Sequence, residues 1–366
     1  MRRIRRATDF RAVPLFVPLL AASILVSVPA ALAQRGQNPP VDLELRSEFE
    51  VPAADQQSRA IVRAALAFLD GLSPELRAKA VLPFEDNAQR ANWSNLPENF
   101  VQRAGVQLGE LNTEQEAALF ALLGELLSPS GVRNIDLQLV AEEMLDNREM
   151  FQREFYKASF LGEPAEDEPW MFQFGGHHLA INTTVFGPWV SFAPMLTGGQ
   201  PTRITYRGEP VYIVEKEVAA AHALLASLTP DQKIRAVRGG RAINLLLGPG
   251  EDDVVLAPEG LPGKDLSQKQ KELLLALIDT RLQFLNADDG AAKREQLAAE
   301  LDDIWFGWWG PEEPRGTGYF RVTAPSLVLE YAPQGRRNPE DHIHSMYREP
   351  GNDYGASWIS VQPEGP

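Results

Sequence analysis

The stretch "LSPELRAKAV" (residues 72–81) returns 156 residues later as "LTPDQKIRAV" (residues 228–237). A second stretch, "LNTEQEAALFALL" (residues 111–123), returns 155 residues later as "LSQKQKELLLALI" (residues 266–278). Each copy begins with a Ser, Thr or Asn suited to a helix N-cap, and apolar residues then recur at helical spacing in the second pair. Repetition at a nearly constant offset predicts a chain built from two related halves.

The repeat extends into alternating, strand-like segments. Setting Phe172 on Phe320 places Asn182 on Glu330, and each segment passes a Gly or Pro break before it alternates. We expect hairpins that pair strand 177–186 with 189–195, and strand 326–332 with 341–348. The predicted fold is α+β, with two pseudo-symmetric halves that each place helices before a β-hairpin and that pack around a shared mixed or antiparallel sheet. The expected segments are an export signal (1–33), a linker (34–54), the halves (55–200 and 201–355) and a tail (356–366).

The N-terminus has the features of an export signal. "MRRIRR" is basic, residues 14–28 are apolar, and Ala31-Leu32-Ala33 forms a small-residue cleavage signal before Gln34. An uncleaved N-terminal anchor is the alternative. We expect cleavage near Ala33, a periplasmic or extracellular location, and no membrane span in the mature chain.

The charge and the absence of cysteine narrow the functions. The 366-residue chain has 35 basic and 50 acidic residues, and removal of the signal leaves 30 basic and 49 acidic, a net charge of −19. A chain this acidic repels phosphate backbones, so we expect no nucleic-acid partner. Without cysteine, disulfides, thiolate catalysis and thiolate metal sites are excluded. A transition-metal site must therefore use His and carboxylate ligands.

Four of the five histidines lie in two short polar stretches, "GGHHLAIN" and "DHIHSMYREPGNDYG". Two histidines spaced His-x-His on a strand project the same way, which suits two ligands of one metal ion. We predict one divalent transition metal, preferably Zn²⁺, with Cu²⁺, Fe²⁺ or Mn²⁺ as alternatives. The candidate ligands are His178, His342, His344 and Glu330, with His177 competing with His178 for its place.

Hydrogen-bonded structural histidines are the alternative interpretation of the same pattern. Asp341, Asp353 and Asn182 are candidates to orient the imidazoles. The remaining histidine, His222, lies in a helical run and is predicted to be structural.

Three residues are candidates for catalysis: Glu330 as ligand or base, Arg348 as a clamp for an anionic group, and Asp353, aimed at the site by a Pro-Gly turn. The first hypothesis is a metal-dependent hydrolase acting on a small, possibly anionic, molecule. A copper or iron oxidoreductase on the same ligands is the second. A non-catalytic protein that binds a metal or a small ligand is the third.

The histidine stretches, the "SLVLEY" segment and the early "NWSNLP" and "LSPELRAKAVLPF" pieces resemble the bacterial and fungal family named domain of unknown function 3500. The resemblance covers residues 55–355. It implies homology to an uncharacterised family and implies no activity.

Overall fold

Helix boundaries follow the predicted capping residues. The computed structural model describes residues 38–335 and 337–361. The predicted export signal and the last residues of the tail lie outside this part. In the repeated segments, Asn112 and Ser267 cap helices through reciprocal side-chain and backbone hydrogen bonds with Gln115 and Gln270. The helices are α1 (Gln56–Asp70), α2 (Pro74–Ala80), α3 (Asn87–Arg90), α4 (Thr113–Leu126), α5 (Pro129–Glu143), α6 (Glu215–Ser227), α7 (Pro230–Ala236), α8 (Gln268–Leu282), α9 (Ala287–Ala299) and α10 (Ala356–Ile359).

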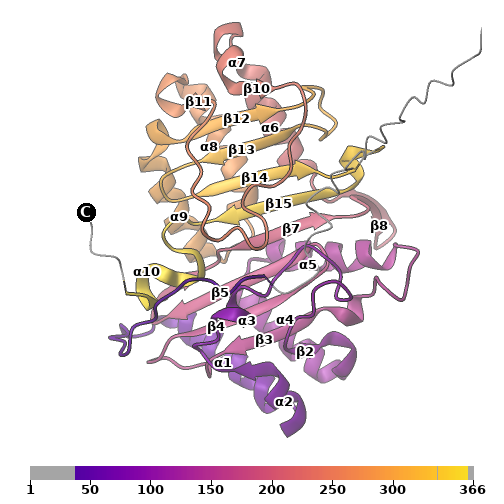
Figure 1. Ribbon diagram of the computed structural model, residues 1–366, viewed down its shortest axis with the longest axis vertical. Helices are drawn as coiled ribbons and strands as arrows, with labels where there is room; N and C mark the ends of the chain where they lie inside the picture. Colours follow the sequence, from indigo (N-terminus) through magenta and orange to yellow (C-terminus); the bar gives the residue numbers. More distant parts are fainter. Residues whose placement is uncertain (1–37, 336, 362–366) are drawn as a thin grey trace, which may run out of the picture. The chain divides into compact units, whose positions relative to one another are not determined.

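One large mixed sheet organises the described residues, which belong to a single compact unit. Its main path runs β1-β3-β4-β5-β7-β15-β14-β13-β12-β10, and β2, β6 and β11 attach to β3, β5 and β12 (Figure 1). A separate hairpin pairs β8 with β9. The strands are β1 (Val81–Leu82), β2 (Val106–Gln107), β3 (Lys157–Leu161), β4 (Trp170–Gly176), β5 (Leu179–Phe186), β6 (Trp189–Ser191), β7 (Met195–Gly199), β8 (Arg203–Tyr206), β9 (Glu209–Tyr212), β10 (Val237–Gly239), β11 (Leu261–Pro262), β12 (Trp305–Trp309), β13 (Tyr319–Thr323), β14 (Val328–Pro333) and β15 (Ile343–Arg348).

The same order of pairings occurs on both sides of the sheet. A short strand after α2 pairs in parallel with β3, and a short strand after α7 pairs in parallel with β12. Antiparallel neighbours then follow from β3 to β5 and from β12 to β15. The α+β class and the shared mixed sheet are confirmed, whereas the pseudo-symmetry of the halves stays a prediction.

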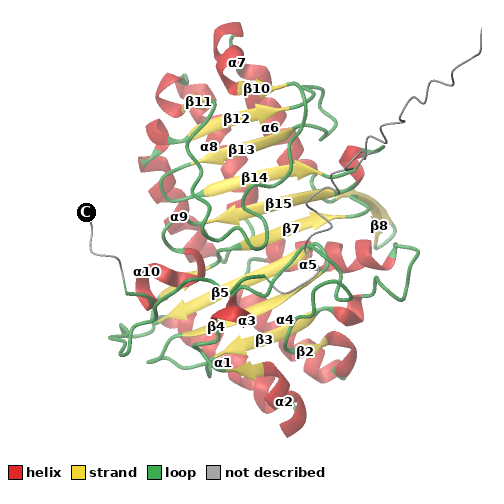
Figure 2. Cartoon of the chain, in the orientation of Figure 1, coloured by secondary structure: helices red, strands yellow, loops and turns green. Residues whose placement is uncertain are grey.

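The two faces of the sheet are covered differently. The long helices α1, α4, α6 and α8 pack on one face (Figure 2). The main apolar core lies between these helices and the sheet. The other face carries a smaller cluster around Met171, Leu196 and Met346, covered by loop residues such as Trp93. No helix in the described part of the chain is long and apolar enough to cross a membrane.

The predicted hairpins are partly correct. In the second, β14 and β15 begin two residues later than expected. In the first, the expected strand 189–195 ends at Ser191, and a new strand, β7, begins at Met195. That new strand pairs with β15 over five residue pairs, from Met195↔Tyr347 to Gly199↔Ile343, and joins the two halves.

Candidate metal centre

His177 and His178 form the two-residue turn between β4 and β5, and therefore do not begin a strand as predicted. Gly176 and Leu179 are the last paired residues before this turn. A side chain at Gly176 would place its Cβ 2.8 Å from the Tyr156 ring, which explains the glycine directly before the histidines. His178 has a φ of 60°. Left-handed backbone is unfavourable for residues other than glycine, and such strain concentrates at functional sites.

The other two histidines come from the second half of the chain, at the start of β15, which pairs with β7. His342 follows a 3₁₀ turn and directly precedes β15, and His344 is the second residue of that strand. His344 pairs with Gly198 of β7, where an added Cβ would lie 2.1 Å from the Ile343 carbonyl oxygen. This close approach brings the start of β15 to the turn that holds His178.

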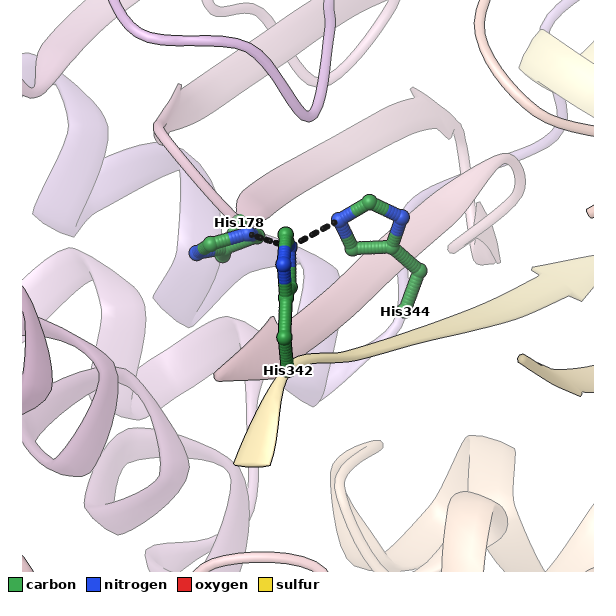
Figure 3. Close-up of side chains that lie close together, drawn as sticks. All are labelled: His178, His342 and His344. Atoms are coloured by element: carbon green, nitrogen blue, oxygen red, sulfur yellow. Dashed lines mark hydrogen bonds between the residues drawn. The ribbon is translucent and has the colours of Figure 1, made fainter. Parts of the chain in front are cut away.

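Three imidazoles converge through the same ring atom, Nε2 (Figure 3). The Nε2 atom of His342 lies 2.8 Å from Nε2 of His178 and 3.2 Å from Nε2 of His344. Nitrogens bound to Zn²⁺ at about 2.0–2.1 Å with tetrahedral angles lie about 3.3–3.4 Å apart. The 3.2 Å distance is therefore close to that between two ligands of one zinc ion, and the 2.8 Å distance is about 0.5 Å shorter.

Hydrogen bonding among the three rings does not account for the arrangement. Burial lowers the pKa of His342 to about 4 and the pKa values of His178 and His344 well below the usual range, so the rings are neutral at pH 7. An imidazole Nε2 has one in-plane position, occupied either by a hydrogen or by a lone pair. His342 Nε2 can therefore satisfy one of its two neighbours but not both. The amide nitrogen of Asn95 lies 3.4 Å from His344 Nε2 and offers that ring another donor. A cation would instead receive all three lone pairs at once.

His177 points to a different partner, the carboxylate of Glu142 on α5. Its Nδ1 atom lies 2.8 Å from Glu142 Oε2, and its ring lies against the His178 ring, tilted by 33°, with 3.6 Å between ring centroids. Burial raises the pKa of Glu142 to about 8 although Arg103 and Arg148 oppose the shift. Burial, with His342 and Arg103 acting in the same direction, lowers the pKa of His177 to about 3. Both shifts favour the uncharged forms of the two groups.

Glu142, His177 and His178 form a second group with ligand atoms within 4.8 Å of one another. The two groups share His178, so the carboxylate adjoins the three-histidine cluster. Sequence reasoning missed Glu142, because a glutamate near the end of a helix ordinarily faces solvent and nothing in its spacing connects it to a turn 35 residues later.

The structure does not place Glu330 with the histidines. It lies on the expected face of β14, but it pairs with Met346, whereas His344 pairs with Ala332. Two residues along a strand correspond to about 6.5–7 Å. The Glu330 carboxylate instead accepts hydrogen bonds from the Leu246 and Leu247 amides and from the Tyr319 hydroxyl.

Arg348 and Asp353 also lie away from the histidines. Arg348 is four residues beyond His344 on β15, about 13 Å along the strand. Its guanidinium bonds Asp353 at 2.8 Å and Asp252 at 3.0 Å. Burial raises the pKa of Asp353 to about 6 against the effect of Arg348. The predicted turn therefore holds these two residues to each other and does not aim them at the imidazoles.

The remaining predicted residues have local partners. Asn182 donates to the Pro194 carbonyl and accepts from Gln173. Asp341 accepts from the Thr202 amide. His222 is buried and lies edge-on against Trp308, and its structural role stays a prediction.

The chain belongs to the family described as "Protein of unknown function (DUF3500)", which matches residues 54–356. The resemblance to this family is confirmed over most of the chain. No curated protein and no solved structure matches this chain.

Proposed function

We propose that the protein is an exported, metal-dependent hydrolase whose single divalent ion, preferably Zn²⁺, is held by His178, His342 and His344. The observation that carries the proposal is the Nε2 atom of His342, which faces two other Nε2 atoms and can hydrogen-bond only one of them.

Three neutral imidazoles suit Zn²⁺ and leave a fourth coordination position for water or substrate. His178 and His344 are 3% and 4% exposed, whereas His342 is only partly buried. Solvent therefore reaches the cluster on the His342 side, where we place a small-molecule substrate.

A bound divalent ion supplies Lewis acidity and lowers the pKa of a coordinated water. Glu142 and His177 adjoin His178, a ligand of the proposed ion, and their Oε2 and Nδ1 atoms lie 2.8 Å apart. We assign Glu142, in place of Glu330, as the general base. Its pKa of about 8 leaves a deprotonated fraction near neutral pH, and this carboxylate takes the proton from the attacking water. Arg103 is buried nearby and donates to the Gly176 carbonyl beside the turn, which fixes the turn's position.

A copper oxidoreductase on the same ligands is the second candidate. The three converging donors are all nitrogen, a set that Cu²⁺ also accepts. A paramagnetic signal from the purified protein, with activity that requires oxygen or peroxide, would favour this candidate over a hydrolase.

Elemental analysis tests the metal site directly. The protein from Gln34 onward is purified without a polyhistidine tag and compared with a His342→Ala/His344→Ala double variant. We expect about one metal equivalent in the wild type and none in the variant. Absence of metal from both, after incubation with Zn²⁺, Cu²⁺, Mn²⁺ and Fe²⁺, would overturn the proposal and favour structural histidines.

A second variant separates the hydrolase from a non-catalytic metal-binding protein. Glu142→Gln keeps the shape of the side chain but removes the proton acceptor, so we expect it to retain the metal and lose hydrolysis in a panel of ester, amide and phosphoester substrates. A wild type that retains its metal and hydrolyses none of them would favour the non-catalytic protein.

Export is a proposal from the sequence alone. Fractionation of the producing cells, with the intact mass of the recovered protein, tests it. A mass that begins at Gln34 in the extracytoplasmic fraction supports export, and a full-length cytoplasmic protein contradicts it.

A further inference from the structure

A cavity of about 180 Å³ lies on the helix-covered face of the sheet. Its floor is formed by Thr197 and Gly198 of β7, and its walls come from α5, α8 and the segment that leads into α6. Thr197 pairs with Ser345, whereas Gly198 pairs with His344. Since successive side chains on a strand point to opposite faces, the cavity lies across the sheet from the imidazole cluster.

A buried arginine in the cavity wall is incompletely bonded. Arg281 is 3% exposed, and its Nη1 donates to Thr197 Oγ1 at 2.6 Å. Its Nε and Nη2 atoms have no hydrogen-bond partner among the described residues. The Oδ1 atom of Asn134, in the same wall, also has no partner among them. Buried polar groups are normally bonded, and a guanidinium with two open donors in a fork is suited to a carboxylate.

A buried carboxylate, Glu217, lines the same cavity. It is 7% exposed and accepts a hydrogen bond from Ser345 Oγ at 3.1 Å. Among the described residues it forms no ion pair with Arg281 within 4.0 Å, although the two charges are close enough to affect each other's pKa. Two opposite buried charges that face one cavity without touching are suited to a ligand with complementary groups at both ends.

The sequence repeat supplies an internal comparison. Continuing the offset of 155 residues aligns Arg281 with Leu126, and continuing the offset of 156 aligns Glu217 with Ile61. Leu126 and Ile61 are fully buried on α4 and α1. The corresponding helices of the first half therefore pack with apolar residues at these positions, so packing of such helices does not itself require the buried charges.

We propose that this cavity binds a small carboxylic acid with a hydrogen-bond donor on the adjacent carbon, that is, an α-amino or α-hydroxy acid. Arg281 receives the carboxylate and Glu217 accepts from the amino or hydroxyl group. The exposed residues of the cavity lining include Arg133, Lys216 and Glu215, whose net charge of +1 favours entry of an anion. The site is independent of the proposed metal.

Calorimetric titration of the full mature chain tests the proposal, with glycine, L-serine, glycolate and L-lactate as probes and acetate and methylamine as controls. We expect saturable binding of an amino or hydroxy acid, and which probes bind identifies the donor group. Binding should be at least about tenfold weaker in Arg281→Leu. Arg294→Leu, which removes an exposed arginine on α9 outside the cavity, should bind as the wild type does.

Three results would overturn the proposal: no saturable binding of any probe to the wild type, equal binding by a folded Arg281→Leu variant, or binding of acetate as tight as that of the substituted acids. Circular dichroism establishes that each variant is folded. If Arg281→Leu does not fold, Arg281→Lys keeps the charge and removes the fork, and the same loss of binding is expected.

Discussion

Zinc should raise the thermal stability of the metal-free protein, and His342→Ala should abolish this effect. The matched control is His177→Ala, which also removes an imidazole of the same cluster but one bonded to Glu142 and outside the three-nitrogen group. Both variants lose packing, so the starting melting temperatures differ. The zinc-induced change in melting temperature is the quantity to compare.

The size of the effect follows from binding to the native state alone. A free Zn²⁺ concentration 100-fold above Kd adds about 2.7 kcal/mol to the free energy of unfolding. With an unfolding entropy of about 2.1 cal/mol/K per residue, a folded unit of roughly 320 residues changes its melting temperature by about 4 °C for that increment.

Scanning calorimetry of chelator-treated protein at buffered zinc concentrations measures this change. We expect an increase of about 4 °C for the wild type, most of it retained in His177→Ala and none in His342→Ala. An equal increase in His342→Ala would refute the three-histidine assignment. Loss of the increase in His177→Ala alone would show that the ion binds the Glu142 group instead.

Three further changes test other features of the structure. His178→Gly should be about 1 kcal/mol more stable than His178→Ala in urea unfolding, because only glycine adopts the positive φ freely, and neither should bind zinc; equal stabilities would contradict the strained turn. Burial raises the pKa of Asp289, in the first turn of α9, to about 6, so the folded state binds a proton that the unfolded state releases near pH 4. Wild-type stability therefore falls as pH rises from about 4 to 6, and the stability of Asp289→Asn relative to wild type should increase over that window and then stay constant. A pH-independent difference between the two proteins would contradict the shift. The double variant Arg281→Leu/Glu217→Ile should gain about 1–4 kcal/mol of unfolding free energy without ligand, and a loss of stability would show that the buried charges support the fold.

The sequence predicts the individual helices and strands better than it predicts which strands pair with each other. Capping residues and the repeat located α4 and α8 because these signals are local. The strand β7 was missed because "MLTGG" is short and ends in two glycines, and its role depends on pairing with β15, about 150 residues away. Pairing over that distance leaves no periodic signal in either segment.

The sequence predicts which histidines form the candidate site better than it predicts which other residues lie beside them. The polar histidine stretches indicated a cluster, and the structure brings His178, His342 and His344 together. Side-chain alternation predicts the face of β14 on which Glu330 lies. The strand register decides which residues meet, and Glu330 pairs with Met346, two residues beyond His344. Strand register is not readable from one strand alone.

The separation of the ligands along the chain has a consequence for where the ion is acquired. His178 and His342 are 164 residues apart, and they meet only when β15 has joined β7. No partly synthesised chain that ends before residue 342 can hold the complete ligand set. A chain that crosses a membrane unfolded would therefore complete its site after translocation, and the proposed metal would be drawn from the pool outside the cytoplasm, with its identity set by what that compartment supplies.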